Sequence, residues 1–251
     1  MTALSKRIVT VLTFNNGVLF RTKLFHPDYR YTLNFVDAWS VDEIVVLDVT
    51  RQGGTGAKEF HDAIGGFASR CFVPLAAGGG IRTLDDVARF LDSGADKIVI
   101  NTGALQRPSL ITEIAESYGS QCVVLSIDAK QTADGGYEVY ADAGSMPTGR
   151  RPREWAQEAE QLGAGEILIT SIDRDGSLEG YDLNLSSQVA EAVGIPVLAL
   201  GGCGSWAHMQ DLFSNTSVDA ACTQNIYHFT ETSIRSAKSF LSKRGVAIRT
   251  E

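Results

Sequence analysis

The sequence contains no apolar run approaching the roughly 20 residues that a membrane-spanning helix needs. Residues 1–6 are mostly polar and lead directly into an apolar stretch, so no signal peptide is predicted. Positive charge is not in excess either, because the formal net charge is −8 and the acidic residues are scattered. These features argue against a membrane protein and against a general binder of nucleic acid or anionic membranes. A cytoplasmic location is expected.

Cysteine and histidine are scarce, with four of each in 251 residues. The cysteines form no close C-x-x-C pair, and neither a Cys–His nucleophile pair nor a cluster with metal-ligand spacing is visible. Reduced thiols, mostly buried, are therefore expected at Cys71, Cys122, Cys203 and Cys222. We expect no metal and no cofactor.

Apolar runs alternate with helical patterns along what we interpret as a single α/β domain, residues 1–251. Strands are predicted at 7–14, 43–48, 72–77, 97–101, 122–127, 166–170, 196–200 and 219–223. Helices are predicted at 34–40, 57–69, 83–93, 108–118, 152–162, 183–193, 205–213 and 231–243. Strands that alternate with helices pair in parallel. Eight such units in this length predict a (β/α)8 barrel, with a doubly wound open sheet as the alternative.

Two loops and the start of one helix have sequence features that predict local structure. Residues 18–33 show no clean period, and loops of that length are often functional lids. Asp134-Gly135-Gly136 predicts a hairpin turn. Thr83 is the predicted N-cap of the helix that follows it.

The chain also repeats itself. Residues 41–44, Gly78-Gly79 and 94–96 resemble residues 164–167, Gly201-Gly202 and 217–219, each 123 positions later. That period is far longer than a solenoid repeat. It predicts two similar half-barrels, about 1–120 and 121–251, and favours the closed barrel over the open sheet.

Residues at the carboxyl ends of barrel strands face the active site. Asp128 ends the buried fifth strand and is the strongest acid–base candidate. The other predicted strand ends are small or polar: Thr13, Asp48, Gly78–Gly80, Asn101, Ser171, Gly201-Gly202 and Asn225. Glycine lets a backbone approach a phosphate closely, so the two glycine-rich turns predict two anion sites. Two such sites imply an elongated ligand with a phosphate at each end.

These residues give the chain a resemblance to the cyclase subunit of imidazole glycerol phosphate synthase, a barrel that receives ammonia from a glutaminase. The resemblance covers essentially the whole sequence. It is most specific in GAGEILITSIDRDG at 163–176, with further matches in SIDAK at 126–130, GGGIR at 78–82, ADK at 95–97 and YHF at 227–229.

The resemblance implies roles for individual residues. It makes Asp128 one of two catalytic aspartates. One phosphate site would comprise Gly79, Gly80, Asn101 and Thr102, and the other Asp175, Gly176, Gly201, Gly202 and Asn225, although the family usually has Ser at 225. Asp48, Ser171 and Arg21 are further substrate-binding candidates. A charged ring that gates ammonia would comprise Arg7, Glu43, Lys97 and Glu166, and Asp96 would belong to the bottom face that docks the glutaminase.

The sequence departs from the family pattern at the first strand. Val11-Leu12-Thr13-Phe14 stands where the family has Cys-Leu-Asp-Val, so Thr13 replaces the second catalytic aspartate. A threonine hydroxyl cannot act as a carboxylate, and a two-carboxylate mechanism needs an acid and a base. Arg21 replaces a lysine of the family's mobile loop, and Thr50-Arg51-Gln52 replaces Thr-Ala-Ser.

Three functions are consistent with this pattern. The leading hypothesis is a divergent paralogue that accepts ammonia from a glutaminase and supports amidination of a sugar nucleotide in surface-polysaccharide synthesis. The second is a working cyclase of histidine biosynthesis that uses Asp128 alone or with another carboxylate such as Asp48. The third is a non-catalytic barrel that only binds a glutaminase. The related isomerase family shares the repeat but does not need the charged ring, although such residues also occur as ordinary ion pairs at strand starts.

Overall fold

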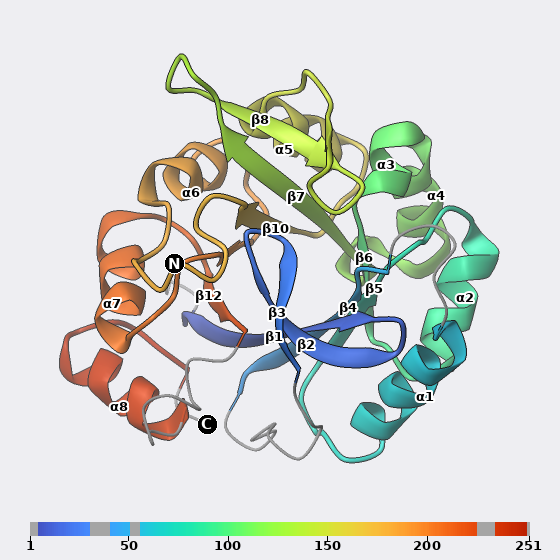
Figure 1. The fold of residues 1–251 in the computed structure, drawn as a ribbon, viewed down its shortest axis with the longest axis horizontal. Coiled ribbons are helices and arrows are strands. Elements are labelled where there is room, and N and C mark those ends of the chain that lie inside the picture. Colours follow the sequence, from blue (N-terminus) through green and yellow to red (C-terminus); the bar gives the residue numbers. More distant parts are fainter. Residues whose placement is uncertain (1–4, 31–40, 51–55, 225–233, 250–251) are drawn as a thin grey trace.

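The computed structural model describes residues 5–30, 41–50, 56–224 and 234–249. In these ranges, eight parallel strands close into a barrel (Figure 1). Around the barrel their order is β1 (Arg7–Asn15), β4 (Glu43–Asp48), β5 (Leu75–Gly78), β6 (Lys97–Ile100), β7 (Val123–Gln131), β10 (Glu166–Ser171), β11 (Val197–Leu200) and β12 (Ala220–Thr223). Pairing of β12 with β1 completes the ring. The predicted (β/α)8 barrel is confirmed.

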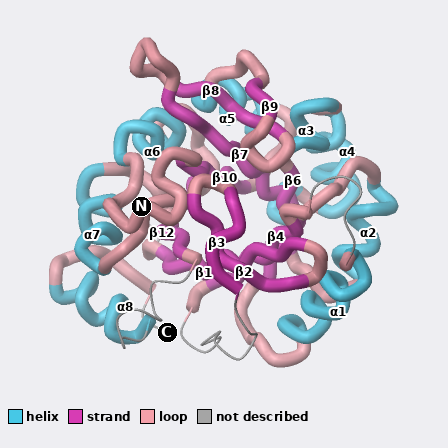
Figure 2. Tube along the Cα trace, viewed as in Figure 1, coloured by secondary structure: helices cyan, strands magenta, loops and turns pink. Residues whose placement is uncertain are grey.

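Helices form the outer layer and the strands the inner ring (Figure 2). The helices are α1 (Ala57–Ala68), α2 (Leu84–Asp92), α3 (Thr102–Gln106), α4 (Ser109–Tyr118), α5 (Pro152–Gln161), α6 (Leu183–Ala190), α7 (Trp206–Asn215) and α8 (Ile234–Lys243), with a 3-10 turn at Ser120–Cys122. Their apolar faces bury large side chains such as Phe60 and Trp155 against the outward faces of the strands. Thr83 caps α2 in a capping box with Asp86, as predicted.

The barrel interior holds a second, smaller apolar cluster. Side chains alternate between the two faces of a strand, so Val9 and Val11 point inward whereas Ile8 and Leu12 pack against helices. Val45, Val99 and other small or branched residues complete the interior cluster. Successive inward residues of each strand therefore run from the bottom of the barrel to its mouth.

Residues 18–30 form a hairpin, where the sequence predicted a connection without regular structure. It consists of β2 (Val18–Lys23) and β3 (His26–Arg30). Strand β12 pairs only with the first half of β1, up to Thr10. Strand β2 pairs antiparallel with the end of β1, from Thr13 to Asn15. The hairpin therefore extends the barrel wall above β12.

The other differences are local. The strand predicted at 72–77 begins only at Leu75, and Phe72 is 84% exposed. The predicted turn at 134–136 is confirmed, and it joins β7 to an added strand β8 (Tyr137–Ala141) that pairs with β9 (Met146–Pro147). The short helix α3 was not predicted, and the predicted helix at 34–40 lies outside the described residues.

Strand register relates the two halves of the barrel. Leu47 pairs with Thr13 in the first half, and Thr170 pairs with Asp128 in the second, so Thr13 and Asp128 occupy equivalent positions. Ile44 pairs with Leu75 and Ile167 with Val197, which makes β5 and β11 equivalent at an offset of 122 rather than 123. The predicted match of Gly78-Gly79 to Gly201-Gly202 was therefore wrong by one residue, and Gly79-Gly80 is the equivalent pair.

No helix among the residues that the structure describes is long and apolar enough to cross a bilayer.

Candidate functional site

A cavity of about 670 Å³ lies at the carboxyl ends of the strands. Eight of the residues predicted for the site line it, namely Thr13, Asp48, Gly79, Gly80, Asn101, Thr102, Asp128 and Asp175. The hairpin contributes Thr22 and Phe25 to the same wall. The cavity is therefore at the place where barrel enzymes carry their active sites.

Asp128, the candidate acid–base group, lines this cavity. Its side chain is 9% exposed and accepts a hydrogen bond of 2.8 Å from Asn101 Nδ2. Burial, together with the negative charge of Asp175, raises the pKa of Asp128 to about 7, although hydrogen bonds from Thr170, Ser126 and Asn101 oppose the shift. Near neutral pH such a carboxyl can both donate and accept a proton.

Thr13 holds the equivalent position in the other half-barrel. It is buried, and its hydroxyl donates a hydrogen bond of 2.7 Å to the carbonyl oxygen of Phe20 in β2. The hydroxyl proton is thus committed to the hairpin. Position 13 supplies no carboxylate opposite Asp128.

The anion-binding candidates of the first half lie open to the cavity. Gly80 has a φ of +68°, and nothing would lie within 4 Å of a side chain built on it. The Thr102 hydroxyl accepts a hydrogen bond from the Asp142 amide, so its own proton can be donated to a ligand. Asn101 Oδ1 is buried without a hydrogen-bond partner in the described part of the chain. The guanidinium-bearing residue Arg82 lines the same part of the cavity, and sequence reasoning had not assigned it to the site.

The candidates of the second half are placed differently. Ser171, Gly176, Gly201 and Gly202 do not line the cavity. The Ser171 hydroxyl faces Asp182 at 3.5 Å. Asn225 and the side chain of Arg21 lie outside the described residues.

Gln224 and Thr22 are among the polar residues of the cavity that were not predicted as site residues. Gln224 lines it and bonds Thr22, which is itself part of the wall. Strand register makes Gln224 the equivalent of Asn101, so the sequence repeat applied at 123 would have identified it. No sequence signal marked Thr22, because its partners lie 153 and 202 residues away.

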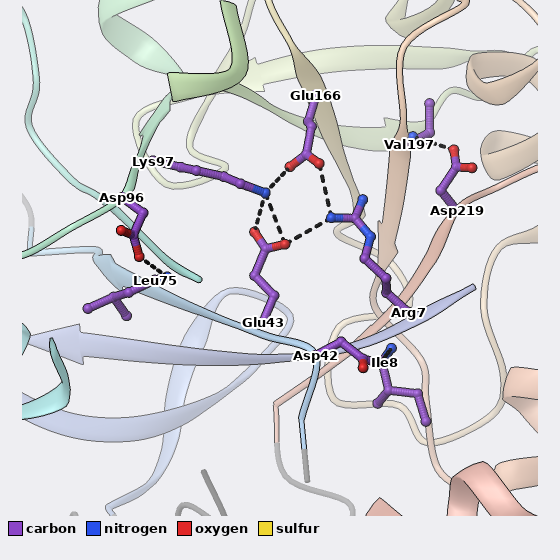
Figure 3. Close-up of polar contacts among 10 residues, drawn as sticks. All are labelled: Arg7, Ile8, Asp42, Glu43, Leu75, Asp96, Lys97, Glu166, Val197 and Asp219. Atoms are coloured by element: carbon purple, nitrogen blue, oxygen red, sulfur yellow. Dashed lines mark hydrogen bonds and ion pairs between the residues drawn. The ribbon is translucent and has the colours of Figure 1, made fainter. Parts of the chain in front are cut away.

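The predicted charged ring assembles at the opposite end of the barrel (Figure 3). Arg7 pairs with Glu43 at 2.9 Å and with Glu166 at 3.0 Å, and Lys97 contacts the same two carboxylates at 3.0 and 2.8 Å. All four side chains are largely buried. Burial raises the pKa of the Glu43 carboxyl although both cations oppose this shift. Each charge is therefore paired twice, as buried charges require.

Acidic residues beside the ring bind backbone amides at strand starts. Asp96 accepts a hydrogen bond of 2.9 Å from the Leu75 amide, and Asp219 accepts one of 3.0 Å from the Val197 amide (Figure 3). Asp96 and Asp219 therefore make the same kind of contact in the two halves of the barrel. Asp96 is thus fixed at the bottom face, close to the ring.

The described residues contain no cluster of three or more His, Cys, Asp or Glu side chains able to hold a metal ion. All four cysteines are free thiols, and Cys122, Cys203 and Cys222 are buried.

Fold and site together define a (β/α)8 barrel with a polar cavity at the carboxyl ends of its strands and a closed ring of paired charges at the other end. The chain belongs to the family described as "Histidine biosynthesis protein", which matches residues 9–233. It is similar to the imidazole glycerol phosphate synthase subunit HisF of Clostridium botulinum strains Langeland and Okra. Both relatives are 44% identical over 252 residues, covering 98% of this chain and 99% of the relative. The family resemblance predicted from the sequence is confirmed.

Proposed function

We propose that this chain is a barrel that accepts ammonia from a glutaminase subunit and has diverged from the cyclase reaction, serving instead the amidination of a sugar nucleotide. The divergence from the cyclase reaction is inferred from the presence of threonine at position 13. Thr13 stands at the position equivalent to Asp128, and its hydroxyl proton is held by Phe20. A mechanism with an acid and a base on opposite sides of a substrate lacks one of the two groups here.

The bottom of the barrel supports the ammonia-accepting part of the proposal. The ring formed by Arg7, Glu43, Lys97 and Glu166 closes the barrel end, and the interior above it is lined by Val9, Val45 and other apolar side chains. An apolar interior favours uncharged ammonia over ammonium, because moving a charge into it carries a large desolvation cost. In this proposal the glutaminase docks at the bottom face, with Asp96 in the interface.

The test is a cyclase assay on the purified chain, with the bisphosphate substrate of the histidine pathway and excess ammonium salt. External ammonia removes the need for a glutaminase. We expect no turnover by the wild type and a gain of turnover in Thr13→Asp. Thr13→Ser is the matched control, because it changes the same position without adding a carboxylate.

The outcomes separate the candidate functions. A robust wild-type cyclase activity that Thr13→Asp merely lowers would overturn the proposal. Turnover by neither chain, with tight binding of a glutaminase, favours the non-catalytic barrel. A loss of all gained turnover in Thr13→Asp/Asp128→Asn would place the two carboxylates in one mechanism.

The second candidate is a working cyclase of histidine biosynthesis. What favours it is the 44% identity to HisF subunits along nearly the whole chain. It would require Asp128, alone or with Asp48 in the same cavity, to act as both acid and base. A pKa of about 7 suits Asp128 to either role, but each proton transfer would then have to use the same group in turn.

A further inference from the structure

We propose that the β2–β3 hairpin occupies the anion-binding position of the second half-barrel, so that the cavity takes a ligand with one anionic group rather than a bisphosphate. This inference deepens the proposed function and rests on it, because it names the class of ligand that the diverged site accepts. Its basis is a difference between two halves that the strand register makes equivalent.

The register defines which residues to compare. Gly80 and Asn101 in the first half correspond to Gly202 and Gln224 in the second. In the first half, the space in front of Gly80 is empty, and the Thr102 hydroxyl accepts a hydrogen bond from the Asp142 amide and keeps its own proton for a ligand. In the second half, other groups of the protein lie against the corresponding residues.

Thr22 of the hairpin forms hydrogen bonds with polar groups of the second half. Its backbone amide donates to Gln224 Oε1 at 3.2 Å, and its hydroxyl accepts from Gln224 Nε2 at 2.9 Å. The same hydroxyl donates to Asp175 Oδ1 at 2.9 Å. Both hydrogen-bonding atoms of the Gln224 amide are thus bound to one residue of the hairpin. An anion at Gln224 would have to displace Thr22.

The backbone of the second half is covered as well. The Phe25 amide donates to Asp175 Oδ2 at 2.9 Å, and the Leu24 amide donates to the Asp175 carbonyl at 3.1 Å. A side-chain carbon built on Gly176 would lie 2.7 Å from the Thr22 carbonyl oxygen. The hairpin therefore lies directly against the turn that carries Asp175 and Gly176.

The space beside Gly202 is occupied by Gly180 rather than by the hairpin. The Gly202 carbonyl accepts the Gly180 amide at 2.8 Å, and a side-chain carbon built on Gly202 would lie 2.0 Å from the Gly180 carbonyl oxygen. A carbonyl oxygen in that direction repels an anion. The first half, in contrast, offers an open glycine at Gly80, a hydroxyl proton at Thr102 and the cation Arg82.

The experiment titrates inorganic phosphate, a monophosphorylated pentose and a 1,5-bisphosphorylated pentose into the full chain by calorimetry. We expect one phosphate per chain. The bisphosphate should bind at most about twofold more tightly than the monophosphate, the statistical effect of having two phosphates that can each bind, whereas a second engaged site gives tenfold or more. Arg82→Ala should weaken the binding of all three ligands.

Thr22→Val tests the hairpin directly, since it keeps the size of the side chain and removes the hydrogen bonds of its hydroxyl with Gln224 and Asp175. This variant should bind a second phosphate, and Thr22→Ser, which keeps the hydroxyl, should still bind one. Two phosphates per wild-type chain, a tenfold preference for the bisphosphate, a single phosphate in Thr22→Val, or no phosphate binding by the folded wild type would each overturn the inference.

Failure of this inference and failure of the proposed function give different results. A chain that binds two phosphates but has no cyclase activity keeps the proposed function and loses the inference. A chain that binds one phosphate and still turns over the cyclase substrate keeps the inference and loses the proposed function.

Discussion

Replacing Asp128 by Asn should stabilise the protein at neutral and alkaline pH but not in acid. The pKa of Asp128 is raised to about 7 because the carboxylate is buried and faces the charge of Asp175. The folded protein therefore keeps a proton that the unfolded chain releases near its ordinary value of about 4. Stability carried by that proton is fully present below pH ~4 and is lost as the pH rises to about 7.

The size of the effect follows from the two pKa values. Each pKa unit corresponds to roughly 1.4 kcal/mol, so a carboxyl shifted from about 4 to about 7 costs the folded state on the order of 4 kcal/mol once both states are ionised. Asn has nearly the same shape, and its amide oxygen can still accept the hydrogen bond from Asn101. The free energy of unfolding of Asp128→Asn should exceed that of the wild type by a few kcal/mol at pH 8.

Urea unfolding of both chains from pH 4.5 to pH 8.5 measures this difference. Asp134→Asn is the control: hydrogen bonds from Thr132 and Gly136 lower the pKa of Asp134, so this carboxyl stays ionised across the range and the difference of Asp134→Asn from the wild type should stay constant. A difference between Asp128→Asn and the wild type that stays constant across the range would refute the reasoning. It would mean that Asp128 titrates alike in both states.

Two further predictions concern the stability of the fold. Glu43→Gln removes one of the two carboxylates shared by Arg7 and Lys97, and breaking such a buried pair should cost about 3–5 kcal/mol, measured by urea unfolding. A smaller loss in Glu43→Gln/Lys97→Met than in Glu43→Gln alone would identify the unpaired cation as the cause. Thr83→Ala should cost about 1 kcal/mol through loss of the N-cap of α2, while Thr83→Ser should be nearly neutral; equal losses in both would exclude the cap as the cause.

The barrel could be predicted from the sequence because its elements are defined locally. Strand β4, Glu43–Asp48, was predicted with its observed bounds, since a short apolar run between polar residues has one plausible structure. The strand predicted from Phe72 was extended too far because apolar character alone cannot tell a buried residue from an exposed one. Hydrophobic pattern thus predicts which elements exist better than where they end.

The site could be predicted only where it depends on position along a strand. Asp128 and Asn101 end their strands, and a closed barrel brings such ends to one face. The contacts of Thr22 with Asp175 and Gln224 join residues far apart in the chain, and no local pattern encodes them. The glycine equivalence was missed by one residue because β11 follows β5 at an offset of 122 positions, whereas β10 follows β4 at 123.

Thr13 and the hairpin are physically linked. The Thr13 hydroxyl donates its proton to the Phe20 carbonyl, at the point where β2 begins to pair with β1. An ionised aspartate at position 13 would have no proton to donate and would place its charge against that carbonyl oxygen. The family's aspartate and this hairpin therefore compete for the same space and the same hydrogen bond. Threonine at position 13 supplies the proton for this hydrogen bond, and it supplies no carboxylate opposite Asp128.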